Sequence, residues 1–163
     1  MNILQNEAPA AAEALIGKIL VRRFEDGREI RARITETEAY YTEADTACHA
    51  HKGRTKRTEV LYHRAGTVYV YLCYGMHWML NLVTGAEDSP QAVLIRGVES
   101  VSGPGRVTKY LGIDKTLNDT MLGESLRLED DGFVPENIER TGRIGIGYAS
   151  PEDQARLWRF VAK

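Results

Sequence analysis

The chain has 163 residues, 43% of them hydrophobic and 27% charged, a composition typical of a globular protein with one core rather than of a disordered or fibrous chain. No apolar run approaches the roughly 20 residues of a membrane helix, and the N-terminus lacks the basic and apolar segments of a secretion signal. Cys48 and Cys73 are too few and too far apart for a disulfide framework or a zinc site, so we expect free thiols and a cytoplasmic protein, associated with the nucleoid if its source is bacterial.

The net charge of −2 gives no overall sign of a nucleic-acid partner, but the charges are unevenly distributed. Residues 50–64 contain five basic side chains and one acid, whereas residues 111–140 contain eight acids and three basic side chains. A local basic segment is enough to bind phosphates with release of counterions. A solvated charged loop explains the same pattern equally well.

The first half of the chain predicts one helix followed by strands. Residues 6–16 are rich in alanine and precede a glycine, which predicts a short helix. Residues 18–24 and 29–40 predict two strands joined by an Asp-Gly hairpin turn. Residues 41–57 show no periodicity and predict a long loop, after which Thr58 is expected to cap a short helix.

The second half predicts mostly strands. A helix is expected to begin at Gly103-Pro104-Gly105 and to end near Gly112. The expected strands cover residues 67–74, 77–84, 91–99, 125–129, 143–148 and 155–161. No repeat or linker divides the chain, so residues 1–163 predict a single α+β domain with a curved, mainly antiparallel sheet and short peripheral helices.

Three tyrosines lie along one predicted strand, in the segment Thr-Val-Tyr-Val-Tyr-Leu-Cys-Tyr-Gly of residues 67–75. Because strand side chains alternate between faces, Tyr69 and Tyr71 share a side, and Tyr74 lies at a turn beside Gly75. A ring at such a tip can stack on a flat partner such as a nucleic-acid base. Packing between strands is the more common role of strand aromatics, so this segment alone does not assign a function.

Polar residues interrupt the apolar rows of three predicted strands. The apolar row of residues 30–34 continues through Glu36 and Glu38, and Asn81 and Arg96 lie on apolar rows of later strands. A buried carboxylate is costly unless it is paired, hydrogen-bonded or open to a cavity. A structural ion pair between Glu38 and Arg96, or an amide bonded to backbone, would explain any one of them. Together they favour a pocket with apolar walls and a few polar groups.

Motifs for metal or nucleotide cofactors are missing from the sequence. The histidines lack metal-ligand spacing, there is no Cys-x-x-Cys, and neither a Gly-x-Ser-x-Gly nor a Walker-type phosphate loop is found. We therefore expect neither a metal nor a cofactor.

An ordered series of segments between about residues 15 and 160 resembles the alkyladenine (3-methyladenine) DNA glycosylase family, of the mammalian N-methylpurine type. The matching segments are Glu36-Thr37-Glu38-Ala39-Tyr40, Ala47-Cys48-His49-Ala50, Gly53-Arg54-Thr55, Tyr69-Val70-Tyr71-Leu72-Cys73-Tyr74-Gly75-Met76 with Asn81, Val93-Leu94-Ile95-Arg96, Gly103-Pro104-Gly105-Arg106 and Arg143-Ile144-Gly145. The resemblance implies a monomeric, metal-free enzyme that flips a damaged purine out of duplex DNA and hydrolyses its N-glycosidic bond, leaving an abasic site.

The resemblance also implies a role for individual residues. Glu38 would be the general base that activates water, with Glu36 as the alternative, and Arg96 would help to hold that water. Tyr74 would wedge into the DNA helix. The base pocket would be formed by Tyr40, His49, Tyr71 and Asn81, the last excluding the amino group of normal guanine. Weak phosphate contacts are expected from Lys52, Arg54, Arg57 and Arg106.

Two other functions fit the same residues. A non-catalytic module that binds damaged nucleic acid would retain the tyrosines and the basic loop, with Glu38 as an ion-pair partner of Arg96. A hydrolase of free nucleosides would use the same acid and aromatic side chains without binding duplex DNA.

Overall fold

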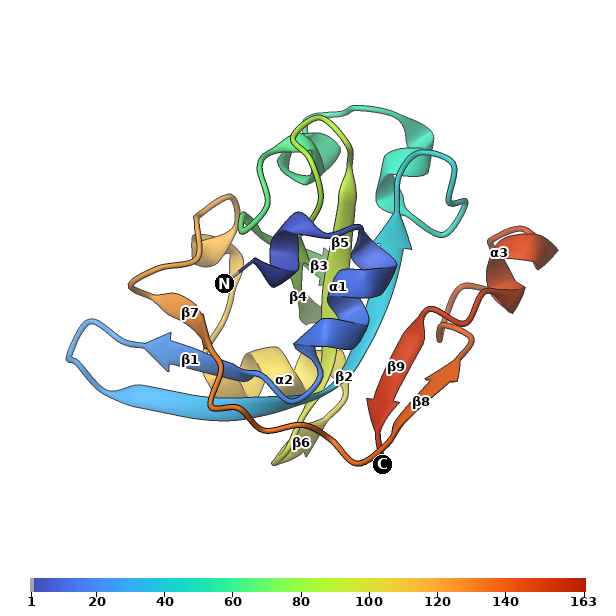
Figure 1. Ribbon diagram of the computed structural model, residues 1–163. Helices are drawn as coiled ribbons and strands as arrows, with labels where there is room; N and C mark the ends of the chain where they lie inside the picture. Colours follow the sequence, from blue (N-terminus) through green and yellow to red (C-terminus); the bar gives the residue numbers. More distant parts are fainter. Residues whose placement is uncertain (1) are drawn as a thin grey trace.

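One long strand, β2 (Glu29–Tyr41), organises the fold. In the computed structural model, which describes residues 2–163, the first part of β2 pairs with β1 (Ile19–Arg23). Its second part pairs with β5 (Gln91–Val98) on one edge and with β9 (Arg159–Ala162) on the other. This change of partners along one strand accompanies the curl of the sheet in Figure 1.

The sheet is antiparallel throughout, with the strand order β3-β4-β5-β2-β1-β7 and with β6 and β8 attached to β5 and β9. The remaining strands are β3 (Val68–Cys73), β4 (His77–Val83), β6 (Val101–Ser102), β7 (Leu126–Glu129) and β8 (Ile138–Thr141). The helices are α1 (Ala8–Leu15), α2 (Pro104–Leu111) and α3 (Pro151–Ala155), with 3-10 turns η1 (Ile3–Gln5), η2 (His49–Lys52), η3 (Thr58–Tyr62) and η4 (Lys115–Leu117). The predicted α+β class, with a curved antiparallel sheet and short helices, is confirmed. Within residues 2–163, no helix combines the length and apolarity needed to cross a membrane.

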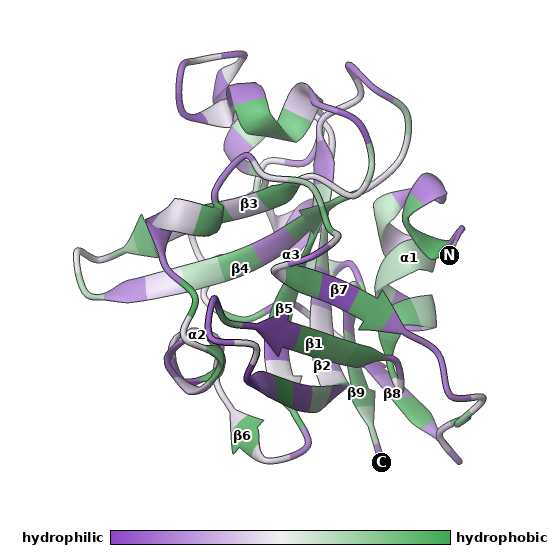
Figure 2. Cartoon of the chain, turned by 90° about the vertical axis from the view of Figure 1, so that its left-hand side faces the viewer, coloured by the Kyte–Doolittle hydropathy of each residue, from purple (hydrophilic) through white to green (hydrophobic). Residues whose placement is uncertain are grey.

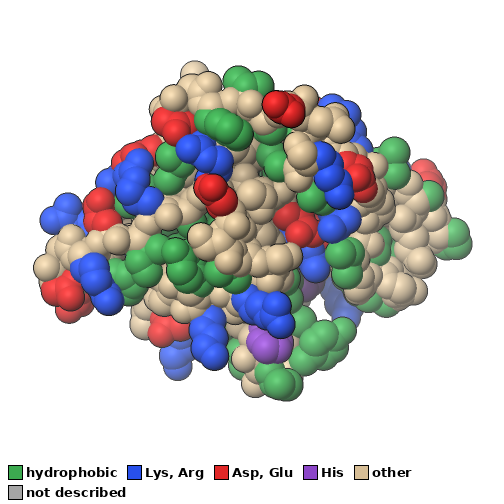
Figure 3. Space-filling view, turned by 90° about the horizontal axis from the view of Figure 1, so that it is seen from below, with side chains coloured by type: hydrophobic (Ala, Val, Ile, Leu, Met, Phe, Trp, Pro, Cys, Tyr) green, Lys and Arg blue, Asp and Glu red, His purple; other side chains and the backbone are tan. Residues whose placement is uncertain are grey.

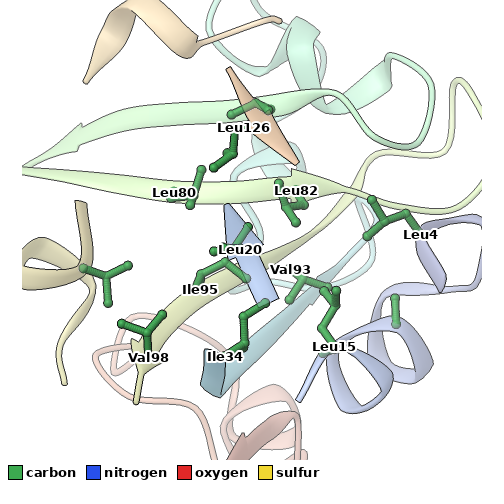
Figure 4. Packing of buried hydrophobic residues seen from close by; sticks show 14 of the residues in the cluster. Leu4, Leu15, Leu20, Ile34, Leu80, Leu82, Val93, Ile95, Val98 and Leu126 are labelled. Atoms are coloured by element: carbon green, nitrogen blue, oxygen red, sulfur yellow. The ribbon is translucent and has the colours of Figure 1, made fainter. Parts of the chain in front are cut away.

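The main core fills one face of the sheet. Ala8, Ala11 and Ala12 of α1 have no exposed surface, so the helix backbone lies close enough for Thr37 of β2 to donate a hydrogen bond to the Ala12 carbonyl at 2.8 Å. Figure 4 shows leucine, isoleucine and valine side chains from several strands packing beside this helix. Full burial of each such side chain stabilises the fold by about 1.5–3 kcal/mol.

The core-facing row of β2 changes part-way along the strand. Ile34 and Ala39 both belong to the main core although they differ in parity, because the β2–β5 register is irregular between them. The irregularity lies opposite Gly97, where a Cβ would come within 3.1 Å of the Glu36 Cβ. Glu36 and Glu38 are buried on the other face of the sheet. The expectation that they continue the row of residues 30–34 is therefore wrong, although the expectation that they are buried holds.

Three smaller expectations are also wrong. Residues 143–148 form bends and turns rather than a strand, and residues 155–158 precede the last strand instead of belonging to it. Gly145 and Gly147 interrupt the first of these segments, Gly142 directly precedes it, and glycine weakens a strand. Thr58 is the first residue of η3 rather than its cap, and its amide donates to the Thr55 hydroxyl at 3.2 Å.

Candidate active site

The second face of the sheet carries a small cavity of about 40 Å³ and an open cleft of about 980 Å³ with shared walls. The cavity is lined by residues of β2, β3, β4, β5, η2 and η3, by the two residues before η2, and by Tyr148. Its walls include all four residues predicted for the base pocket, together with two further tyrosines: Tyr40, His49, Tyr71, Asn81, Tyr69 and Tyr148. The sequence prediction therefore named side chains that the fold brings together from distant segments.

The aromatic wall is tightly packed. The His49 and Tyr71 rings have centroids 4.5 Å apart, and those of Tyr69 and Tyr71 are 5.4 Å apart. His49 Nδ1 lies 2.9 Å from the Tyr69 hydroxyl. Burial lowers the pKa of His49 to about 4, and the charges of Arg57 and Lys52 act in the same direction. The histidine is therefore neutral at physiological pH.

Glu38 lies directly behind this wall with no exposed surface. Its Oε1 accepts a hydrogen bond from the Tyr40 hydroxyl at 2.7 Å, and its Oε2 accepts one from the Ile144 amide at 2.6 Å. Arg96 Nη1 is 3.7 Å from Oε1. Burial raises the pKa of Glu38 above its usual value, while Arg96 and the two hydrogen bonds oppose that rise. Its three partners, Tyr40, Ile144 and Arg96, all line the cleft, so a single layer of residues separates the Glu38 carboxylate from the cleft.

Glu36 has different partners from Glu38. Its Oε2 accepts hydrogen bonds from Arg159 Nε at 2.6 Å and from Arg96 Nε at 3.3 Å. Arg159 in turn donates to the Thr141 hydroxyl at 2.9 Å. Glu36 is thus the centre of an ion-pair group that holds Arg96 from one side, while Arg96 faces Glu38 with the other.

Tyr74 lies at the tip of the β3–β4 hairpin, which projects beyond the other strands in Figure 2. Tyr74 and Gly75 have φ values of 53° and 67°, and the Met76 amide donates to the Cys73 carbonyl at 3.0 Å. Two positive φ values at the centre of a turn define type I′, the turn that suits a twisted hairpin. The Tyr74 side chain is 89% exposed and borders the cleft.

Comparison with known proteins identifies the family. The family model for methylpurine-DNA glycosylase (MPG) matches residues 2–102 and 99–163. The chain belongs to the methylpurine-DNA glycosylase family. The predicted resemblance is thereby confirmed.

Relatives of this methylpurine-DNA glycosylase family member occur in bacteria and archaea. A protein of Borrelia garinii is 44% identical over 96% of this chain and 91% of its own length. One of Psychrobacter cryohalolentis is 44% identical over 90% and 82%, and one of Methanocella arvoryzae is 41% identical over 93% and 86%. All three carry the provisional name 3-methyladenine DNA glycosylase.

The basic residues of this family member differ in their surroundings. Lys52 and Arg57 line the cleft, and the Arg57 guanidinium lies 5.2 Å from the centroid of the Tyr71 ring. Arg106 is exposed on α2, two residues after Pro104, which lines the cleft. Arg54 instead pairs with two carboxylates and packs over an aromatic ring, so it is the least available of the four. Figure 3 shows Lys and Arg side chains spread over the underside of the molecule, with acidic and hydrophobic groups between them.

Sequence reasoning missed the contribution of residues 143–148. Ile144 supplies the amide that binds Glu38, and Tyr148 lines the cavity while its hydroxyl donates to the Ala47 carbonyl at 2.8 Å. The available signal was the repeated glycine in this segment, which is atypical of a strand. Among residues 2–163, no three His, Cys, Asp or Glu side chains are grouped so that they could hold a metal ion.

Proposed function

We propose that the chain is a monofunctional DNA glycosylase of the 3-methyladenine class. It hydrolyses the N-glycosidic bond of an alkylated or deaminated purine in duplex DNA and leaves an abasic site for base excision repair. The observation that carries this proposal is the Glu38 carboxylate, buried behind an aromatic cavity and facing Arg96. Membership of the methylpurine-DNA glycosylase family and the names of the relatives support it.

Glu38 has the surroundings that the reaction requires of a base. Breaking the N-glycosidic bond develops positive charge on the sugar, which a nearby carboxylate stabilises while it accepts a proton from water. Arg96 lines the cleft and faces Glu38, which supports the proposal that it holds that water. A single acid is sufficient because an alkylated, cationic base is already a good leaving group, unlike the sugar alcohols that need a second carboxyl group.

The aromatic cavity suits a flat, electron-poor base. A cationic purine between Tyr71 and neighbouring rings would gain up to about 2 kcal/mol from cation–π attraction in a desolvated site. Because His49 is neutral, it does not repel such a cation. Asn81 donates through Nδ2 to the Tyr69 carbonyl at 3.3 Å, which fixes the amide where we propose that it excludes the amino group of guanine.

The purine must leave the DNA stack to reach this cavity, at a cost of a few kcal/mol. Tyr74 at the hairpin tip would enter the vacated space and offset part of that cost, as other wedge side chains do. Lys52, Arg57 and Arg106 would contact the phosphates. The cleft therefore combines the three functions of wedge, phosphate binding and base pocket.

The test is incubation with duplexes that each contain one lesion: 3-methyladenine, 7-methylguanine, hypoxanthine or ethenoadenine. Alkaline cleavage then reveals abasic product. We expect strand cleavage only after alkali, and no covalent complex with borohydride, because water is the proposed nucleophile. No lysine lies on the strands of the pocket, and Lys52, on the cleft, has the proposed role of a phosphate contact. Absence of excision from all four duplexes would refute the proposal.

The complete burial of Glu38 favours one second candidate, a non-catalytic module that binds damaged DNA. In that case the contacts of Glu38 with Tyr40 and Arg96 would be structural only. Single-turnover excision with protein in excess distinguishes the two, because the module would retain lesion-containing DNA without releasing the base.

A further inference from the structure

A buried arginine lies behind Glu38 and takes no part in the chemistry proposed above. The Arg143 side chain is fully buried. Its Nη1 donates to Asp45 Oδ2 at 2.6 Å and to the Ala39 carbonyl at 2.9 Å. Its Nη2 donates to Asp45 Oδ1 at 3.0 Å and to the Asp153 carbonyl at 3.2 Å. One guanidinium thus joins β2, the segment after β2 and α3.

Both hydrogen-bond donors to Glu38 depend on this arginine. The Ile144 amide, which binds Oε2, belongs to the residue that follows Arg143. The Tyr40 hydroxyl, which binds Oε1, belongs to a ring whose centroid lies 5.0 Å from the Arg143 guanidinium carbon. Removal of Arg143 would release the loop on one side of the carboxylate and the ring on the other.

Stability alone is a weak reason for such a pair. Desolvation of two charges often cancels their attraction, and a hydrophobic replacement of similar volume is frequently neutral or stabilising. The loop of residues 143–148, in contrast, contains two glycines and lacks strand pairing in the structure. A rigid, bidentate anchor at its first residue explains how a flexible sequence presents one amide to Glu38 at 2.6 Å.

We propose that the Asp45–Arg143 pair positions Glu38 for catalysis and keeps its carboxylate ionised. The inference rests on the proposed function, in which Glu38 is the general base. Arg143 is a positioning residue, because it is buried, does not line the cleft, and acts on Glu38 through Ile144, Tyr40 and its own charge.

The direction of the expected pH effect follows from the groups around Glu38. Loss of the Arg143 charge and of either hydrogen bond favours the protonated carboxyl group, so the acid limb of the rate profile moves to higher pH. The ionisable groups that face Glu38 or its immediate partners are Glu36 and Tyr40 on β2, Arg96 on β5, Arg159 on β9, Tyr71 on β3, and Asp45, Arg143 and Tyr148 outside the strands. The Arg143 variants below leave the other ionisable groups of this list unchanged.

The experiment compares Arg143→Lys and Arg143→Met with the wild type in single-turnover excision across pH. We expect the acid limb to rise by about one pH unit in Arg143→Met and by less in Arg143→Lys, which keeps the charge but loses the fork. At a pH below the midpoint of the acid limb, a shift of the limb by one pH unit corresponds to a roughly tenfold lower rate. Lesion-DNA affinity is measured in parallel, because Tyr40 and Ile144, which Arg143 holds, both line the cleft.

Arg33 provides a matched control. It pairs bidentately with Asp131, donates to the Gly17 carbonyl and packs over Phe133, yet it lies outside the cleft. Arg33→Met should lower the melting temperature without moving the acid limb. If Arg143→Met fails to fold by circular dichroism, Arg143→Lys decides the question. A wild-type acid limb in Arg143→Lys with only a lower melting temperature would overturn the proposal.

A readout independent of catalysis separates this inference from the proposed function. The carboxyl carbon of Glu38, labelled with ¹³C-glutamate and assigned by comparison with Glu38→Gln, reports its ionisation by NMR. We expect its titration to move to higher pH in Arg143→Lys even if the wild type excises none of the lesions. An unchanged titration would overturn the positioning role whether or not the protein is a glycosylase.

Discussion

At the scale of single residues, Glu36 and Glu38 lie two positions apart on β2 but have different chemical environments. Glu36 is held by the Nε atoms of two arginines, which stabilise its charge. Glu38 is fully buried, with one hydroxyl, one amide and a more distant guanidinium as partners. Burial raises the pKa of Glu38, so its carboxylate is a better proton acceptor than a carboxylate with an ordinary pKa. This comparison favours Glu38 over Glu36 as the base.

Glu38→Gln should therefore abolish excision while lesion binding persists. The amide keeps the shape of the side chain and one acceptor oxygen but cannot accept a proton from water, so we expect a loss of roughly 10²–10⁴-fold in the single-turnover rate. Electrophoretic mobility of lesion-containing duplexes measures binding. Glu36→Gln is the matched control and should retain most activity. If Glu38→Gln were active and Glu36→Gln inactive, Glu36 rather than Glu38 would be the general base.

The same substitution should stabilise the protein at neutral pH. A carboxyl group whose folded pKa is raised is favoured in its neutral form on folding, so its ionisation destabilises the fold as pH rises above the unfolded value. Glu38→Gln removes that ionisation. Its melting temperature should be higher than that of the wild type at pH 7.5, and the two should converge as the pH falls below 4.5, the ordinary pKa of a glutamic acid. A lower melting temperature for Glu38→Gln at neutral pH would show that the Arg96 attraction outweighs burial.

At the scale of elements, the sequence predicted most strands because alternation and turn residues are local signals. The parity of β2 could not be predicted, because the switch between Ile34 and Ala39 requires the register irregularity with β5 opposite Gly97. Its physical cause is the close approach of Gly97 to Glu36, a contact between residues far apart in sequence. The expectation that Glu38 is buried was thus correct, but the face of the sheet to which its row was assigned was wrong.

The pocket was predictable where motifs are contiguous and not where a loop contributes through its backbone. Tyr40, Tyr71 and Asn81 stand on recognisable strands, and His49 belongs to the contiguous motif Ala47-Cys48-His49-Ala50. The Ile144 amide has no side-chain signature, because any residue supplies an N–H. Only the folded loop shows that it binds Glu38.

The hairpin tip permits a test that separates the wedge from the fold. Tyr74 has a positive φ of 53°, which costs a non-glycine residue about 1 kcal/mol. Tyr74→Gly should therefore raise the melting temperature by about 2–4 °C, as expected for that energy in a chain of this size. It should also weaken lesion-DNA binding and reduce the fluorescence change of 2-aminopurine beside the lesion, which reports flipping.

Met76 provides the control for this test, because it is 73% exposed on the same hairpin. Met76→Ala should leave the flipping signal close to that of the wild type. An unchanged flipping signal in Tyr74→Gly would show that Tyr74 is an exposed surface residue and not the wedge.

At the scale of the whole molecule, the acidic and basic segments lie in different places: the acids pair with strands behind the core, and the basic residues face the cleft. Acids of residues 129–131 are paired with Arg31, Arg33 and Lys18, so they neutralise the strands behind the core. Lys52 and Arg57 face the cleft, and neither takes part in an ion pair among the described residues 2–163. A net charge of −2 is thus compatible with a locally basic DNA-binding side.

This arrangement predicts which charges control the salt dependence of DNA binding. Each phosphate contact contributes nearly one unit to the slope of log affinity against log salt. Lys52→Ala and Arg57→Ala should each lower the magnitude of that slope by about 1 for an undamaged duplex, measured by fluorescence anisotropy between about 50 and 200 mM KCl. Arg54→Ala is the control from the same segment and should leave the slope unchanged, because Glu59 and Asp88 already neutralise Arg54. A lower slope for Arg54→Ala, with no change for Lys52→Ala, would place the DNA backbone on the other side of this segment.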